Sequence, residues 1–139
     1  IDGGCRYSFF VVDDKSRFKL EFFMKSRKEM PKYVKRALDE CARQGHTVSY
    51  FRLDNEFDTK EMREMLAEQR VRPEFSAPMR QQQNGVAERS IRTWFKMIRG
   101  CLLDQGRPKS YWKMAAQCCT FIQNRIFTSA CPDAVPAEE

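Results

Sequence analysis

The sequence of 139 residues is poor in the residues that build zinc sites and histidine-dependent catalytic sites. It has one histidine, His46, and six cysteines that form no Cys-x-x-Cys pair. A zinc site needs four nitrogen or sulfur ligands, and a Ser-His-Asp or Cys-His site needs a well-placed histidine. Both kinds of site are therefore disfavoured. The adjacent Cys118 and Cys119 stand in an apolar stretch, so we expect buried free thiols in a reducing compartment.

Long apolar runs are also missing. No stretch approaches the roughly 20 residues of a membrane helix, and the first residues lack the pattern of a signal peptide. With 42% hydrophobic and 32% charged residues, the composition suits one globular domain or part of one, and not a membrane, collagen-like or disordered protein. Because the sequence begins with Ile1 instead of Met, we expect a piece of a longer protein.

Positive charge is abundant and unevenly distributed. Lys and Arg number 25 against 19 Asp and Glu, a net charge of +6. The stretch 78–113 holds eight basic and two acidic residues, so it accounts for the whole excess. A concentrated basic segment of this kind indicates a polyanionic partner.

Hydrophobic periodicity predicts the element order β-β-α-β-α-β-α-α. Strands are expected at 5–13, 18–24, 48–53 and 71–75, and helices from Pro31 to about Gly45, after Asp58 or Thr59, from Val86 to Gly106, and from Pro108 to about Arg125. The alternation predicts an α/β fold with a mixed sheet flanked by helices. The leading hairpin fits an RNase H-like sheet that lacks its first strand. The segment 76–85 is expected to be a loop.

Two acidic residues stand where metal-dependent sites form. Asp54 follows a predicted strand, and sites of open α/β sheets gather at the carboxyl ends of strands. Glu88 falls in the first turn of the longest predicted helix. Carboxylates bind hard cations such as Mg²⁺, and paired metals serve phosphoryl chemistry. By these residues alone a plainer interpretation is favoured, in which Asp54 is a turn or cap residue and Glu88 a favourable acid at a helix N-terminus.

The longest predicted helix also carries a basic stripe. Its members, spaced 3, 4 and 3 residues apart, are Arg89, Arg92, Lys96 and Arg99. A basic stripe beside a metal-binding acid suits a phosphodiester substrate. The alternative is a solvated helix face, which the one-sided clustering of charge disfavours.

These segments resemble a known family. The eight residues Gln82 to Arg89 (QQNGVAER), with Ser76-Ala77-Pro78 before them and Arg92-Thr93 after them, closely resemble the integrase core of Ty1/copia-type retrotransposons. Further agreement extends over nearly the whole chain in the right order, in Gly4 to Tyr7, Val12 to Phe18, Arg52 to Asn55, and Leu102 to Asp104 before Trp112.

The resemblance implies a polynucleotidyl transferase that processes DNA ends and joins them to target DNA. The family uses an Asp, Asp, Glu triad on two Mg²⁺ or Mn²⁺ ions, and Asp54 and Glu88 match its second and third members as catalytic and metal-binding residues. The first Asp of the family lies on a strand that would precede Ile1. The residues expected to contact nucleic acid are Gln83, Asn84, Gly85, Arg89, Arg92, Lys96 and Arg99.

The resemblance further implies a partial catalytic core over residues 1–127 and an irregular tail over 128–139. DNA is the expected partner, without a membrane and with self-association possible, in an intracellular and nuclear location. Activity of this chain as given is left open because one metal ligand is missing from it. The alternative is a non-catalytic nucleic-acid-binding module, decayed or domesticated, and an RNase H-type hydrolase is a third reading.

Overall fold

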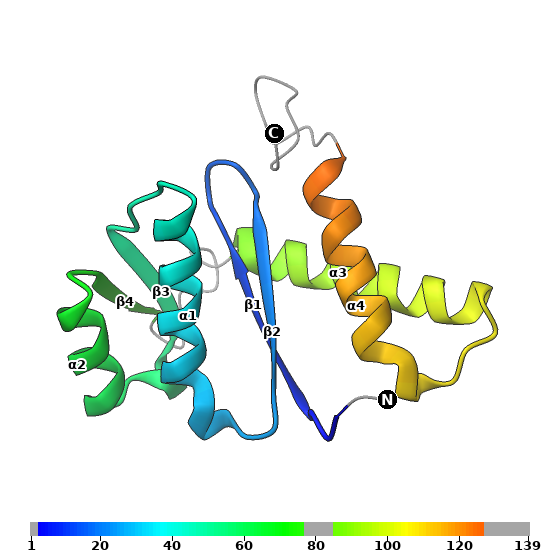
Figure 1. Cartoon of the computed structure of the whole chain (residues 1–139), viewed down its shortest axis with the longest axis horizontal. Helices are drawn as coiled ribbons and strands as arrows, with labels where there is room; N and C mark the ends of the chain where they lie inside the picture. The colour runs from blue at the N-terminus through cyan, green and yellow to red at the C-terminus, as the bar shows by residue number, and fades with distance from the viewer. Residues whose placement is uncertain (1–2, 77–84, 127–139) are drawn as a thin grey trace. The chain divides into compact units, whose positions relative to one another are not determined.

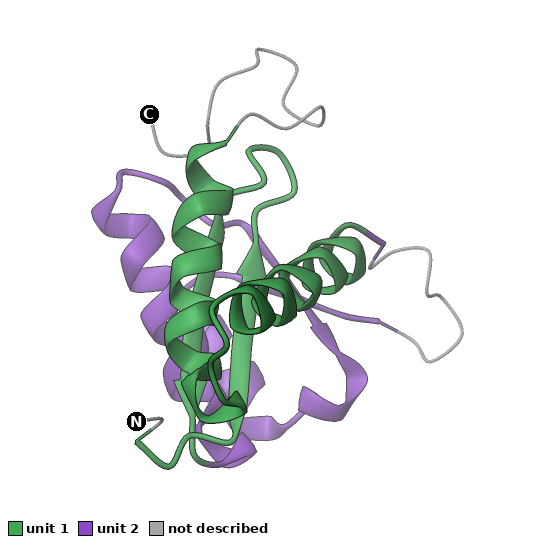
Figure 2. Cartoon of the chain, turned by 90° about the vertical axis from the view of Figure 1, so that its right-hand side faces the viewer, with its two compact units in different colours: residues 1–25, 86–139 green, residues 26–85 purple. Residues whose placement is uncertain are grey.

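The computed structural model describes residues 3–76 and 85–126 (Figure 1). It divides into two compact units, which are coloured separately in Figure 2. We call residues 1–25 with 86–139 the hairpin unit, and residues 26–85 the parallel unit. The predicted order of strands and helices is confirmed. None of the helices in the described ranges has the length and apolar character that a membrane crossing requires.

The hairpin unit begins with two antiparallel strands, β1 (Tyr7–Val12) and β2 (Lys19–Met24). The turn between them is closed by Asp13, whose carboxylate accepts hydrogen bonds from the backbone N–H and the hydroxyl of Ser16, both at 2.7 Å. The unit continues with the helices α3 (Gly85–Asp104, in this unit from Val86) and α4 (Trp112–Arg125). A short 3₁₀ turn, η4 (Lys109–Tyr111), replaces the first turn of the helix predicted from Pro108.

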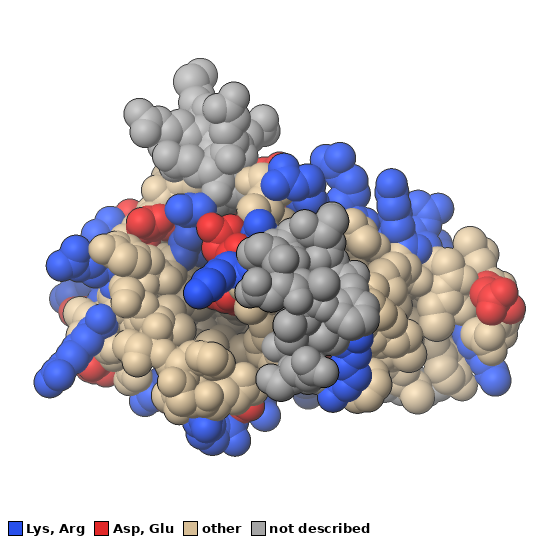
Figure 3. Space-filling model, turned by 90° about the horizontal axis from the view of Figure 1, so that it is seen from above, with Lys and Arg blue, Asp and Glu red and all other residues tan. Residues whose placement is uncertain are grey.

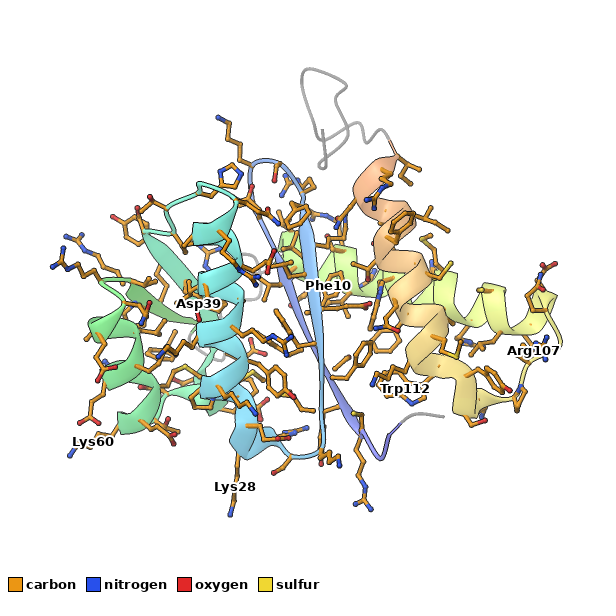
Figure 4. The ribbon with its side chains drawn as sticks, in the orientation of Figure 1. Phe10, Lys28, Asp39, Lys60, Arg107 and Trp112 are labelled. Carbon is orange, nitrogen blue, oxygen red and sulfur yellow. The ribbon has the colours of Figure 1, made fainter. Side chains whose placement is uncertain are left out.

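Aromatic rings fill the core of the hairpin unit. Trp94 of α3 is 1% exposed, and the ring of Phe10 from β1 lies 5.0 Å from it, centroid to centroid. Phe23 of β2 packs edge-on against Trp112 of α4 at 5.3 Å; Figure 4 labels Phe10 and Trp112. The sequence left open whether Trp94 or Phe95 faces inward, and the structure buries Trp94 and leaves Phe95 52% exposed.

The parallel unit contains α1 (Met30–Arg43), β3 (Tyr50–Asp54), α2 (Lys60–Glu68) and β4 (Arg72–Ser76), with the 3₁₀ turns η1 (Arg27–Glu29) and η2 (Asn55–Phe57). β3 and β4 pair in parallel through the crossover helix α2, which contacts both α1 and β4. Its core is mostly aliphatic, with Val34, Leu38, Met62 and Leu66 buried. The N-cap of α2 is Thr59, whose hydroxyl accepts the Met62 N–H at 3.2 Å, and not Asp58.

The mixed α/β class predicted from the sequence is confirmed, but a single sheet is not observed. The described strands hydrogen-bond in two separate pairs, β1 with β2 and β3 with β4. Each pair has the expected partner type, because a short turn joins antiparallel strands and a helix joins parallel ones. The predicted tail, and most of the loop expected at 76–85, lie outside the described residues. The division into a core and a tail therefore stays a prediction.

Five described cysteines are free thiols, but most of them are not buried as the sequence suggested. Cys119 is 3% exposed, and burial raises the pKa of its thiol to about 11. Cys118, the next residue on α4, is exposed. Successive positions on a helix lie about 100° apart, so two adjacent cysteines cannot both face one core.

Candidate nucleic-acid interface and metal ligands

Asp54 is the last residue of β3, at the carboxyl end of the parallel pair. It is exposed and stands in register with Ser76, the last residue of β4. It occupies the N-cap position of η2, yet its side chain makes no capping hydrogen bond there. A capping role for this residue is therefore not supported, whereas its interpretation as a turn residue is untested.

The carboxyl ends of the two strands border a shallow pocket of about 380 Å³, which is lined by Arg52, Glu74, Phe75 and Ser76. The guanidinium of Arg52 donates to the Glu74 carboxylate at 2.9 Å, so these two charges neutralise each other. The Ser76 hydroxyl donates to the carbonyl of Leu53 at 3.2 Å. The pocket next to Asp54 is polar but has little net charge.

Glu88 lies in the first turn of α3, as the sequence predicted, and its side chain is exposed. An acid at this position interacts favourably with the helix dipole. Gly85, one of the three loop residues expected to contact nucleic acid, is the first residue of α3 and is partly buried. Gln83 and Asn84, the other two, lie outside the described residues.

The basic stripe of α3 is exposed along its whole length, at Arg89, Arg92, Lys96 and Arg99. None of these four cations forms an ion pair with any residue in the described part of the chain. Figure 3 shows basic side chains gathered along α3, at the upper right of that view. Trp94 and Ile98 anchor the buried side of the same helix. The core thus fixes which face of α3 presents the positive charge.

Asp54 and Glu88 belong to different units, and the structure describes each within its own unit. As donors they suit Mg²⁺, because both are exposed carboxylates. Among residues 3–76 and 85–126, however, no group of three or more His, Cys, Asp or Glu is placed to hold a metal ion. Asp54 and Glu88 are thus two suitable carboxylate ligands, one in each unit.

Sequence reasoning missed a partly buried chain of polar side chains in the hairpin unit. The indole N–H of Trp94 donates to the Thr120 hydroxyl at 2.9 Å, and that hydroxyl donates to the Glu21 carboxylate at 2.8 Å. Burial raises the pKa of Glu21 to about 7, against the lowering effect of the Thr120 hydrogen bond. The available signal was an acid in the middle of an apolar strand, Leu20 to Phe23.

Comparison with known proteins gives a sequence relative and a matching fold. No family model matches the chain. The retrovirus-related Pol polyprotein from transposon TNT 1-94 of Nicotiana tabacum is 30% identical over 126 residues, which cover 88% of this chain. The chain spans only 10% of the length of that polyprotein.

Among solved structures, a chain of the simian T-cell lymphotropic virus intasome, determined in complex with the PP2A regulatory subunit B56 gamma, matches with a TM-score of 0.71. The match covers 88% of this chain and 44% of that chain, at 17% sequence identity. At this identity the likeness shows the fold alone.

Proposed function

We propose that this chain, which is a relative of the Pol polyproteins of copia-type retrotransposons, serves DNA integration as part of a longer protein. The observation that carries the proposal is the stripe on α3. Four exposed cations without an ion-pair partner among the described residues follow directly after Glu88 on one helix face. Such a row suits the phosphates of DNA, which dominate protein–DNA affinity.

The proposal also includes a fold assignment that is more specific than the two observed strand pairs. We assign the chain to the RNase H-like class, in which the β1–β2 hairpin and the β3–β4 pair belong to one sheet of the complete protein. The element order and the match to an intasome chain support this assignment. The first strand of such a sheet, and the first catalytic Asp on it, would come from outside this sequence.

Asp54 and Glu88 are proposed as two carboxylate ligands of Mg²⁺ or Mn²⁺, two ions in the complete enzyme. When bound, such ions supply Lewis-acid stabilisation of charge on phosphate oxygens. The role of this chain is to present the two carboxylates, one at the end of β3 and one in the first turn of α3. Its second role is to bind the DNA backbone along α3. The nuclear location stays a prediction.

The first experiment tests the acids in the complete parent protein. Asp54→Asn and Glu88→Gln are each expected to reduce strand transfer to background, because each removes a metal ligand but little volume. The matched controls are Asp39→Asn, an exposed acid on α1 labelled in Figure 4, and Glu61→Gln, an exposed acid in the first turn of α2. Strand transfer at the parental rate in either test variant overturns the assignment of that residue.

The second candidate function, a non-catalytic nucleic-acid-binding module, is favoured by the incomplete ligand set among the described residues. It shares the stripe but predicts DNA binding that is unaffected by EDTA. In either case Arg92→Glu with Lys96→Glu should weaken DNA binding and lower the salt slope by about 2.

The control for that pair is Lys28→Glu with Lys35→Glu, two exposed lysines of the parallel unit. Unchanged affinity in the α3 variant identifies the stripe as a solvated surface only. Strand transfer by the parent that requires Mg²⁺ decides against the non-catalytic module.

A further inference from the structure

The helix α2 ends with an arginine where two other helices end with a glycine. At the ends of α1 and α3, Gly45 (φ 79°) and Gly106 (φ 57°) adopt the left-handed conformation that closes a helix. Arg70 holds the same position after α2, with φ 57°. The backbone hydrogen bonds are equivalent in the three motifs; after α2 the N–H of Arg70 donates to Ala67 at 3.0 Å and that of Val71 to Leu66 at 2.9 Å.

A side chain at this position is unfavourable for the backbone. The left-handed region suits glycine, because a Cβ atom there approaches the following carbonyl. Arg70 is therefore kept in a strained conformation that a glycine would relieve. Backbone outliers of this kind are enriched at functional sites, which directs attention to the surroundings of the Arg70 side chain.

Arg70 lines a surface pocket of about 340 Å³ at the amino-terminal edge of the parallel strands. The other lining residues are Thr47, Val48, Ser49, Tyr50 and Arg72. The N–H of Arg72 donates to the carbonyl of Ser49 at 3.0 Å, which ties the start of β4 to the segment before β3. The lining thus combines two guanidinium groups, the hydroxyl groups of Thr47 and Ser49, and the phenol ring of Tyr50, and it contains no acid.

The charges of this pocket differ from those of the pocket beside Asp54. There, Arg52 is neutralised by Glu74. Here, neither Arg70 nor Arg72 forms an ion pair within the described ranges 3–76 and 85–126. The guanidinium of Arg72 instead lies over the ring of Tyr50, 5.9 Å from its centroid.

Tyr50 supplies an aromatic surface beside these cations. Its side chain is 56% exposed, although it begins a strand whose next residue, Phe51, is 8% exposed. An exposed ring next to unpaired arginines is the combination with which proteins bind single-stranded nucleic acid, since every base has a face that stacks and every nucleotide carries a phosphate.

We propose that this pocket binds one nucleotide unit of single-stranded nucleic acid. Arg70 and Arg72 bind the phosphate with help from the hydroxyls of Thr47 and Ser49, and the base stacks on Tyr50. The site lies at the opposite end of β3 from Asp54, about 13 Å along the strand by its rise per residue. It belongs to the parallel unit, whereas the stripe on α3 belongs to the hairpin unit, and it requires no metal, so it goes beyond the proposed function.

The decisive variant is Arg70→Gly, because it separates binding from folding. Glycine fits the backbone at this position, so the melting temperature should be unchanged or higher. Affinity for a short fluorescent oligothymidine strand, measured by anisotropy at low salt, should fall about fivefold or more, with a salt slope lower by about 0.7. Parental affinity and slope in Arg70→Gly overturn the proposal.

The role of Tyr50 is tested with two probes, the oligothymidine strand and an abasic strand of the same length. Tyr50→Leu should weaken binding of oligothymidine about fivefold or more and leave binding of the abasic strand unchanged. An equal loss for both probes, or no loss for either, overturns the stacking of a base.

The matched charge control is Lys28→Gln with Lys35→Gln in the same unit. Lys28 precedes α1, a helix of 14 residues, and the pocket residues follow that helix, so Lys28 is not part of the pocket. This control should bind oligothymidine within twofold of the parent chain. If it weakens binding as much as Arg70→Gly does, the effect is general charge, and the pocket is not a specific site. Because all variants keep the α3 stripe and the assay contains no metal, failure here leaves the integration proposal standing.

Discussion

The two units place their polar interactions differently. In the parallel unit the ion pairs are on the surface, as between Arg27 and Glu56, whose side chains are 61% and 53% exposed. In the hairpin unit the side-chain hydrogen bonds that join helix to strand are buried or partly buried, as between Asn124 and Lys19. Buried polar groups must be satisfied, whereas exposed ion pairs contribute little. The hairpin unit should therefore be the more sensitive to polar substitutions.

The strongest test of this comparison is Asn124→Ala. Asn124 is 3% exposed, accepts the Lys19 N–H at 3.0 Å and donates to the Lys19 carbonyl at 2.9 Å. Its amide thus satisfies the backbone at the start of β2, and removing it leaves both backbone groups buried without that partner. We expect a loss of about 2–4 kcal/mol in the free energy of unfolding, measured by urea denaturation.

Gln117→Ala, at an exposed position of the same helix, is the control and should change stability by less than about 0.5 kcal/mol. Equal stability of the two variants would contradict a structural role for Asn124.

A pH test of Glu21 should give the next largest effect. Burial raises the pKa of this carboxyl from 4.5 to about 7, so the folded chain holds its proton where the unfolded chain has lost it. This contribution to stability is complete below pH 4.5 and is lost as pH rises through 7. Glu21→Gln should therefore be more stable than the parent at pH 8, by about 1–3 kcal/mol, and similar to it at pH 4.

Urea midpoints at pH 4 and pH 8 measure this difference. Glu61→Gln, an exposed acid of the parallel unit, serves as control and should follow the pH dependence of the parent. If Glu21→Gln also follows the parent at both pH values, the pKa of Glu21 is the same in the folded and the unfolded chain, and burial does not raise it.

The smallest effect is expected for the exposed ion pair of the parallel unit. Arg27→Gln removes a contact of 3.0 Å to Glu56, yet it should cost less than about 1 kcal/mol, and less still at high salt. The measurement is the urea midpoint at low and high ionic strength, with Glu56→Gln and the double variant completing a thermodynamic cycle. A loss as large as that of Asn124→Ala would remove the distinction between the two units.

The sequence predicted the elements well because their signals are local. Apolar spacing placed α1 and α3, and Gly45 and Gly106 marked where they end, since their left-handed backbone favours glycine. The end of α2 carried no such signal, because Arg70 occupies the position of the glycine. A search for glycine at helix ends therefore does not detect Arg70, the residue with left-handed backbone after α2.

The candidate sites were predictable only in part. The stripe on α3 follows from helical spacing, and the structure confirms that its residues are exposed. The pocket around Arg70 and Tyr50 was not predicted, because it joins the segment before β3 to the residue after α2. Neither segment contains a recognisable motif. Tyr50 and Arg72 become neighbours only through the parallel register of β3 and β4, which local sequence patterns do not predict.

The sequence by itself determined the order of the elements, the mixed α/β class and the placement of an excess of positive charge on one helix. All three features follow from local signals, since each element and the charge on α3 are recognised from residues close together in the sequence. Only the tertiary structure decided that Trp94, and not Phe95, enters the core, that the partly buried Glu21 accepts a hydrogen bond from Thr120, and that Asn124 satisfies a strand 105 residues away. The burial of Trp94 and the hydrogen bonds of Glu21 and Asn124 depend on which surfaces pack together after folding. Local periodicity in the sequence does not contain that information.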